Sequence, residues 1–294
     1  MKKIFSAVIA LMMTVSVSAQ FYIYLSNGEV LQADSISMVA PPGDGVLSGK
    51  FSVSATEQVQ FSQGNLQYQA STDTWRFATN QYDMIGYDNS NISASYSGWI
   101  DLFGWGTGNN PTNASTDNGD YATFTDWGVN AISNGSNKAN LWRTLTKKEW
   151  AYLFHGRANA ATLFGFGTVN GVKGTILLPD NWTLPVGASF TASTTQGLTE
   201  QGTYYYNEND NNFSHNTYTA EQWSKMESAG AVFLPAAGER GNGTDVINFF
   251  FCGYYWSATP YDTSCAYGLY FHSSRLGQSS SFSRYNGLSV RLVR

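Results

Sequence analysis

The chain has 294 residues and a formal net charge of −5, and 13% of its residues are charged whereas 15% are aromatic. Ordinary domains carry roughly 25% charged residues, so this composition supplies little material for long amphipathic helices. The negative charge argues against a nucleic-acid partner or an anionic membrane held through phosphate contacts.

The first residues have the layout of a secretory signal peptide. Two lysines start the chain after Met1, an apolar run spans residues 4–15, and the small residues 17–19 form a cleavage site. We therefore expect residues 1–19 to be removed from an exported protein, located in the periplasm, at the cell surface or outside the cell. No later stretch approaches the roughly 20 apolar residues that span a bilayer, so no transmembrane segment is expected.

A short hairpin and a linker are expected next. Residues 21–39 alternate apolar and polar side chains around Asn27-Gly28, a dipeptide that favours a hairpin turn. The segment PPGDG at residues 41–45 then predicts a linker. These features assign residues 20–46 to an N-terminal hairpin and linker, and residues 47–294 to the main domain.

Short strands and long loops are expected in much of the main domain. Residues 51–77 show the period of two that is typical of short antiparallel strands, and Asn170-Gly171 predicts a hairpin turn between two more. Residues 231–241 predict a buried strand that leads into a loop. Residues 80–140 are rich in Asn, Ser, Gly, Asp and Thr, which favours irregular loops pinned by the aromatic residues Trp99, Trp105 and Trp127.

Two capping boxes predict the helices. Thr146 with Glu149 three residues later begins one helix, and Thr219 with Gln222 begins a second that runs to Ser228. The sequence therefore predicts an α+β fold with two helices, short antiparallel strands and long irregular loops.

Five segments of the main domain occur in a recognisable order: WRTLTKKEWAYLF, FLPAAGERG, YYWSAT, YGLYF and the terminal GLSVRLVR. With these motifs, residues 47–294 resemble the C-type lectin-like superfamily, in the branch that includes formylglycine-generating enzymes and the variable proteins of diversity-generating retroelements. The likeness is greatest to the variable proteins. It implies a C-type lectin-like ligand-binding domain whose C-terminal segment, about residues 247–294, is rewritten by adenine-directed mutagenesis of a template rich in AAC codons.

The composition of residues 247–294, called the tail below, agrees with that implication. Changing the adenines of AAC cannot produce Lys, Glu, Met, Trp or Gln. The tail contains no Lys, Glu or Met, and it has one Trp, Trp256, and one Gln, Gln278. A low-charge protein can also end by chance in a low-charge or buried segment, but chance explains less well the aromatic and serine runs at residues 248–252 and 279–285.

Strand alternation divides the tail into a scaffold and a binding surface. Leu269 and Phe271 are expected to point inward, as are Leu288, Val290 and Leu292, and Trp256 and Tyr267 are also assigned to the core. Tyr, Phe, Ser and Gly at the remaining positions are the residue types of antibody-like paratopes. We expect them to bind a protein or glycan ligand on another cell, phage or host surface, through Phe249, Phe251, Cys252, Tyr254, Tyr261, Asp262, Ser264, Cys265, Gly268, Tyr270, His272, Ser274, Arg275, Ser280, Phe282 and Tyr285.

No pattern in the sequence predicts catalysis, a metal or a cofactor. The chain has three histidines, His155, His215 and His272, and they lack the spacing of a metal site. The resemblance to formylglycine-generating enzymes implies paired cysteines near the C-terminus, but Cys252 and Cys265 fall at positions that look mutagenised. Whether they form a disulfide or stay as two thiols is open at this stage. The calcium-dependent sugar motif of lectins is also missing, since the corresponding strand is YYWSAT.

A second hypothesis for the function is a surface adhesin, or a pilus or matrix subunit, with a fixed ligand and no diversification. The N-terminal hairpin would then serve in assembly.

Overall fold

A computed structural model describes residues 21–24, 30–33, 44–193, 205–206 and 212–294, and the chain divides into two compact units, residues 1–41 and 42–294. In the first unit, β1 (Phe21–Tyr24) pairs antiparallel with β2 (Val30–Ala33), which is the pairing expected for the N-terminal hairpin. The Asn27-Gly28 turn, the signal sequence and most of the expected linker lie outside the described residues.

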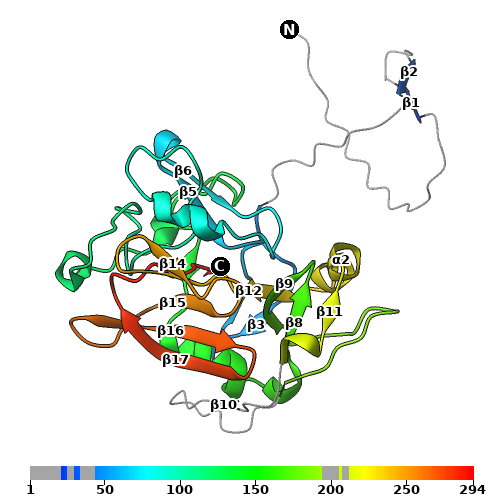
Figure 1. Cartoon of the computed structure of the whole chain (residues 1–294). Helices are drawn as coiled ribbons and strands as arrows, with labels where there is room; N and C mark the ends of the chain where they lie inside the picture. Colours follow the sequence, from blue (N-terminus) through cyan, green and yellow to red (C-terminus); the bar gives the residue numbers. More distant parts are fainter. Residues whose placement is uncertain (1–20, 25–29, 34–43, 194–204, 207–211) are drawn as a thin grey trace. The chain divides into compact units, whose positions relative to one another are not determined.

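The second unit is a mixed α and β structure with few helices and many short strands, as the sequence predicts (Figure 1). The helix α1 (Lys147–Ala151) continues into a π-turn, η5 (Tyr152–Gly156), and the other α-helix is α2 (Ala220–Ser228). The 3₁₀ turns are η1 (Ala70–Thr72), η2 (Gly86–Asn91), η3 (Asn118–Tyr121), η4 (Trp127–Val129), η6 (Ala160–Thr162) and η7 (Asn212–Ser214). None of the helices in the described ranges is long and apolar enough to cross a membrane.

Two four-stranded sheets organise this unit, one in the order β10-β17-β16-β15 and the other in the order β11-β8-β9-β12. All their pairings are antiparallel except that of β11 with β8. The first sheet contains β10 (Tyr205–Tyr206), β15 (Gly253–Pro260), β16 (Cys265–His272) and β17 (Arg275–Ser283), and the second β8 (Phe164–Val169), β9 (Val172–Leu177), β11 (Thr217–Tyr218) and β12 (Val232–Pro235).

The described part of the unit also contains four two-stranded pairs. They join β3 (Phe51–Ser52) to β4 (Gln58–Val59), β5 (Leu66–Gln69) to β6 (Thr74–Phe77), β7 (Arg143–Thr144) to β18 (Leu292–Val293), and β13 (Glu239–Gly241) to β14 (Asp245–Ile247). The first two pairs confirm the short antiparallel strands expected in residues 51–77.

Both predicted capping boxes are present. The Thr146 hydroxyl accepts a hydrogen bond from the Glu149 backbone N–H at 3.3 Å, and the Glu149 carboxylate accepts one from the Thr146 N–H at 2.7 Å. Thr219 and Gln222 make the same reciprocal pair at the start of α2. The hairpin of β8 and β9 also turns where predicted, because Asn170 and Gly171 both have positive φ, +49° and +83°.

The sheet that carries β15, β16 and β17 is covered on both faces. On one face Tyr255, Leu269 and Phe271 belong to a hydrophobic cluster that includes Trp150 and Phe166. On the other face a second cluster joins tail residues to β5, to β6 and to buried residues between 92 and 142, most of which lie in the irregular loops predicted for residues 80–140. Its members from the sheet and its approach are Cys252, Tyr254, Trp256 and Ala266. The strands of the tail are therefore an integral part of the folded domain.

The predicted core residues of the tail are buried, with one exception. Trp256, Leu269, Phe271, Leu288, Val290 and Leu292 are buried as expected. Tyr267, which the sequence assigned to the core, is only half-buried. The Lys147 ammonium lies 4.1 Å from the centre of its ring, so Tyr267 supports a surface cation and does not fill the interior.

Candidate ligand-binding surface

The predicted binding residues divide into three groups by burial. Phe251, Tyr261, Asp262 and Ser264 are exposed. Phe249, Cys265, Tyr270, His272, Arg275, Phe282 and Tyr285 are half-buried. Cys252, Tyr254, Gly268, Ser274 and Ser280 are buried.

The expectation that Tyr254 points outward is wrong, because its side chain is only 6% exposed. Its ring centre lies 5.0 Å from that of Tyr270 and 5.4 Å from that of Phe282. Its hydroxyl accepts a hydrogen bond from the Asn248 amide at 2.9 Å. Alternation along β15 placed Tyr254 on the correct face of the sheet, but that face packs against the loops of residues 92–142 instead of facing solvent.

Gly268 and Cys252 are corrected in the same way. A Cβ added at Gly268 would lie 2.6 Å from the carbonyl oxygen of Tyr255, so the neighbouring strand leaves no room for a side chain there. Cys252 lies beside Tyr270, with its Sγ 3.8 Å from the tyrosine hydroxyl. Both cysteines are free thiols. Burial raises the pKa of the Cys252 thiol, which therefore remains a weak nucleophile.

The most exposed apolar feature of the tail is the loop between β14 and β15. Phe251 is 65% exposed and Phe250 43% exposed, and Ile247 is exposed as well. Phe250 has a φ of +66°, and Asn248 has a φ of +58°. A positive φ is ordinary for Asn but is an outlier for a bulky residue such as Phe.

Three residues outside the tail contact this loop, namely Tyr87, Gly86 and Lys173. The Tyr87 ring, on η2, meets the Phe249 ring edge-on at 5.2 Å, and Tyr87 is itself 66% exposed. Phe249 packs directly on Gly86, where an added Cβ would lie 2.6 Å from the ring. The Lys173 ammonium, on β9, lies 5.1 Å from the centre of the Phe251 ring.

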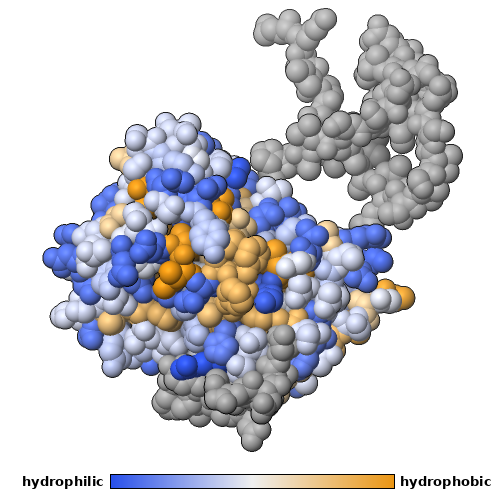
Figure 2. Space-filling view, in the orientation of Figure 1, coloured by the Kyte–Doolittle hydropathy of each residue, from blue (hydrophilic) through white to orange (hydrophobic). Residues whose placement is uncertain are grey.

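We call the set Tyr87, Ile247, Phe249, Phe250 and Phe251 the aromatic loop patch. Figure 2 shows hydrophobic residues gathered in the middle of one face of the second unit, over the region of β14 and β12. The sequence identified Phe249 and Phe251 but missed the other members of this patch, as well as Lys173. Nothing in the local pattern around Tyr87 distinguishes it from other loop tyrosines, since its role depends on a contact across more than half of the chain.

The loop between β15 and β16 forms a second exposed point. Tyr261 is 55% exposed and its ring packs edge-on against Tyr267 at 5.1 Å. The Asp262 carboxylate accepts hydrogen bonds from the backbone N–H groups of Ser264 and Cys265, both at 2.7 Å, which fixes the turn. The guanidinium of buried Arg284 donates to the Asp262 carbonyl. The buried Arg284 side chain thus holds this loop in position.

Two titratable groups near the tail surface have shifted pKa values. Burial, and then the nearby Arg275, lower the pKa of His272. Its Nδ1 accepts a hydrogen bond from the Ser274 N–H at 3.2 Å. Burial also raises the pKa of Glu239, whose carboxylate accepts a hydrogen bond from the Asn286 amide at 2.9 Å. Both shifts favour the neutral form of the side chain.

Among the described residues, no group of three or more His, Cys, Asp or Glu side chains is placed to hold a metal ion. Comparison of the chain with family models, with curated proteins and with solved structures finds no match.

Proposed function

We propose that this chain is an exported, non-enzymatic binding protein that displays a diversified surface, rich in Tyr, Phe and Ser, on a C-type lectin-like scaffold. The observation that carries the proposal is the aromatic loop patch. It exposes several large apolar side chains side by side, and it holds one of them, Phe250, in a left-handed conformation.

Both properties of the patch are costly for a protein that has no use for them. A bulky residue held at positive φ costs on the order of 1–3 kcal/mol, and such strain clusters at functional sites. A contiguous exposed apolar patch is typical of an interaction site. Fully burying one Phe against a partner recovers about 1.5–3 kcal/mol, so two or three such residues could drive specific binding.

Burial refines which tail residues would vary. The exposed and half-buried positions border solvent, so they form the variable set in this proposal: Phe249, Phe251, Tyr261, Asp262, Ser264, Cys265, Tyr270, His272, Arg275, Phe282 and Tyr285. Within this set Tyr270 and Phe282 also pack against buried Tyr254, so a large apolar residue is expected to be favoured at both. The five buried positions, Cys252, Tyr254, Gly268, Ser274 and Ser280, would belong to the scaffold. Tyr87 and Lys173 would be invariant parts of the binding surface.

The neighbourhood of the gene provides the test of diversification. The proposal expects a near-copy of the tail's coding sequence, with AAC codons at the variable positions, beside a reverse-transcriptase gene. If neither is present, the chain is better explained as an adhesin, or a pilus or matrix subunit, with a fixed ligand.

A further inference from the structure

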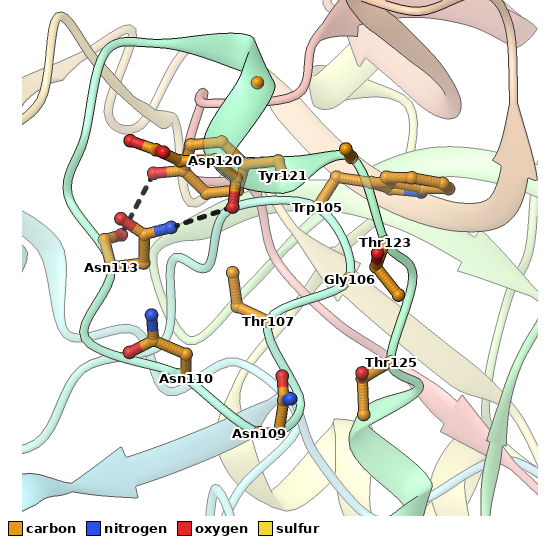
Figure 3. A pocket seen from close by; sticks show the side chains of 12 residues that line it. Trp105, Gly106, Thr107, Asn109, Asn110, Asn113, Asp120, Tyr121, Thr123 and Thr125 are labelled. Carbon is orange, nitrogen blue, oxygen red and sulfur yellow. Dashed lines mark hydrogen bonds between the residues drawn. The ribbon is translucent and has the colours of Figure 1, made fainter.

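A polar pocket of about 260 Å³ lies in the irregular part of the fold, and none of its lining residues belongs to the tail. Its walls come from two stretches of chain, residues 105–113 and 119–125 (Figure 3). This pocket is smaller than the roughly 300–1,000 Å³ of sites for drug-sized ligands. It therefore suits a molecule of about one sugar ring.

The walls of the pocket are held in place before any ligand arrives. Backbone hydrogen bonds at 3.0 Å join Thr125 to Gly106 and Gly108 to Thr125. The Tyr121 hydroxyl donates to the Ser115 carbonyl at 2.9 Å. Its ring packs against Gly104, where an added Cβ would lie 2.2 Å away. A preformed site of this kind loses little conformational entropy on binding.

The tail also secures one wall from behind. The Arg284 guanidinium donates to the carbonyl oxygens of Tyr121 at 3.2 Å and Ala122 at 3.3 Å. The same guanidinium lies 4.4 Å from the centre of the Trp105 ring. The Arg284 guanidinium is already hydrogen-bonded to these carbonyls and does not line the pocket, so it supports the wall from outside.

Several polar side chains of the pocket are free to bind a ligand. The side chains of Asn109, Asn110, Thr123 and Thr125 make no hydrogen bond to any other residue that the structure describes. In Figure 3, Asn109 and Asn110 project toward the space beneath Tyr121, and Thr123 and Thr125 line the other side. Carboxamides and hydroxyls can each donate and accept, and so can the hydroxyl groups of a sugar.

The charge of the pocket narrows the class of ligand. Asp120, at the rim, is its only charged lining residue, and no Lys, Arg or His lines it. An anionic ligand such as a phosphate would meet this carboxylate, and the nearby Arg284 guanidinium lies behind the wall, where it is already hydrogen-bonded to backbone carbonyls. We propose that this pocket binds one neutral monosaccharide unit of a glycan, through hydrogen bonds from its hydroxyls to Asn109, Asn110, Thr123, Thr125 and Asp120.

The test is saturation-transfer NMR on the purified protein with the methyl glycosides of glucose, galactose, mannose, fucose and N-acetylglucosamine. At least one should receive saturation and bind with a Kd on the order of 1 mM. Asn110→Ala and Asp120→Ala should each weaken that binding about tenfold or more. Asn91→Ala changes an exposed asparagine on η2 and should leave binding unchanged.

Failure of this proposal is distinguishable from failure of the proposed function. Phe251→Ala lies in the tail surface and should not affect glycoside binding, whether or not the tail recognises a ligand. If no glycoside receives saturation, or if methylammonium binds in their place, the pocket is not a sugar site. Equal glycoside binding by wild type and by both pocket variants, each with an unchanged melting temperature, would also overturn the proposal.

Discussion

Replacing Tyr254 and Tyr261 by alanine separates scaffold from surface within one strand and the turn that follows it. Tyr254 is 6% exposed, packs against Tyr270 and Phe282, and is hydrogen-bonded to Asn248. Tyr254→Ala should lower the free energy of unfolding by about 3–5 kcal/mol, the cost of removing a large aromatic side chain from a core. Tyr261 is 55% exposed and contacts mainly Tyr267. Tyr261→Ala should change the free energy of unfolding by only about 0.5 kcal/mol in either direction.

Urea denaturation followed by tryptophan fluorescence measures both values, with the m-value as a check that the unfolded state is unchanged. Tyr254→Phe adds a finer test, because it keeps the ring and removes only the hydroxyl that accepts from Asn248. It should cost about 0.5–1.5 kcal/mol. If Tyr254→Ala is as well tolerated as Tyr261→Ala, the second hydrophobic cluster does not cover this face of the sheet, and the division of the tail into scaffold and surface is wrong.

Three further predictions concern other parts of the fold. Both cysteines should react with a thiol reagent in denaturant without prior reduction, because both are free thiols. Cys265→Ser should leave the melting temperature nearly unchanged. Detection of a disulfide by mass spectrometry would contradict the structure. Gly86→Ala should lower the free energy of unfolding, measured by urea denaturation, by about 1–3 kcal/mol, because Gly86 has a φ of +65° and an added Cβ would meet Phe249. Gly119 is exposed and has no positive φ, so Gly119→Ala should lower it by less. Burial raises the pKa of the Asp101 carboxyl to about 6, so the protonated form favours the folded state below about pH 4, and this stabilisation is lost as the pH rises through 6. The free energy of unfolding should therefore fall by up to about 3 kcal/mol between these pH values. Asp101→Asn should flatten that fall.

Local features of the fold could be predicted where the physical cause is also local. The capping boxes at Thr146 and Thr219 and the turn at Asn170-Gly171 depend on contacts within a few residues, and all three occur as expected. Leu288, Val290 and Leu292 are buried as predicted, but the alternate positions Ser289, Arg291 and Val293 are buried as well, so alternation describes only part of this segment.

Alternation does not reveal what covers the second face of a sheet. Tyr254 and Gly268 were expected at the surface, but residues 92–142 and the neighbouring strand bury them. The irregular composition of residues 80–140 gave no indication that this segment supplies a third of the buried residues in the second hydrophobic cluster. In the same way Tyr87 and Lys173 join the aromatic loop patch only through contacts between distant segments.

Sequencing the coding segment of the tail from many cells of one population would show whether the tail presents replaceable side chains from a constant scaffold. We expect substitutions at adenine positions of the template, concentrated in the codons of exposed and half-buried residues such as Phe251, Tyr261 and Tyr270. The codons of Tyr254, Trp256, Gly268 and Arg284 should be constant. An invariant tail, or variation spread equally over buried and exposed codons, would contradict the claim.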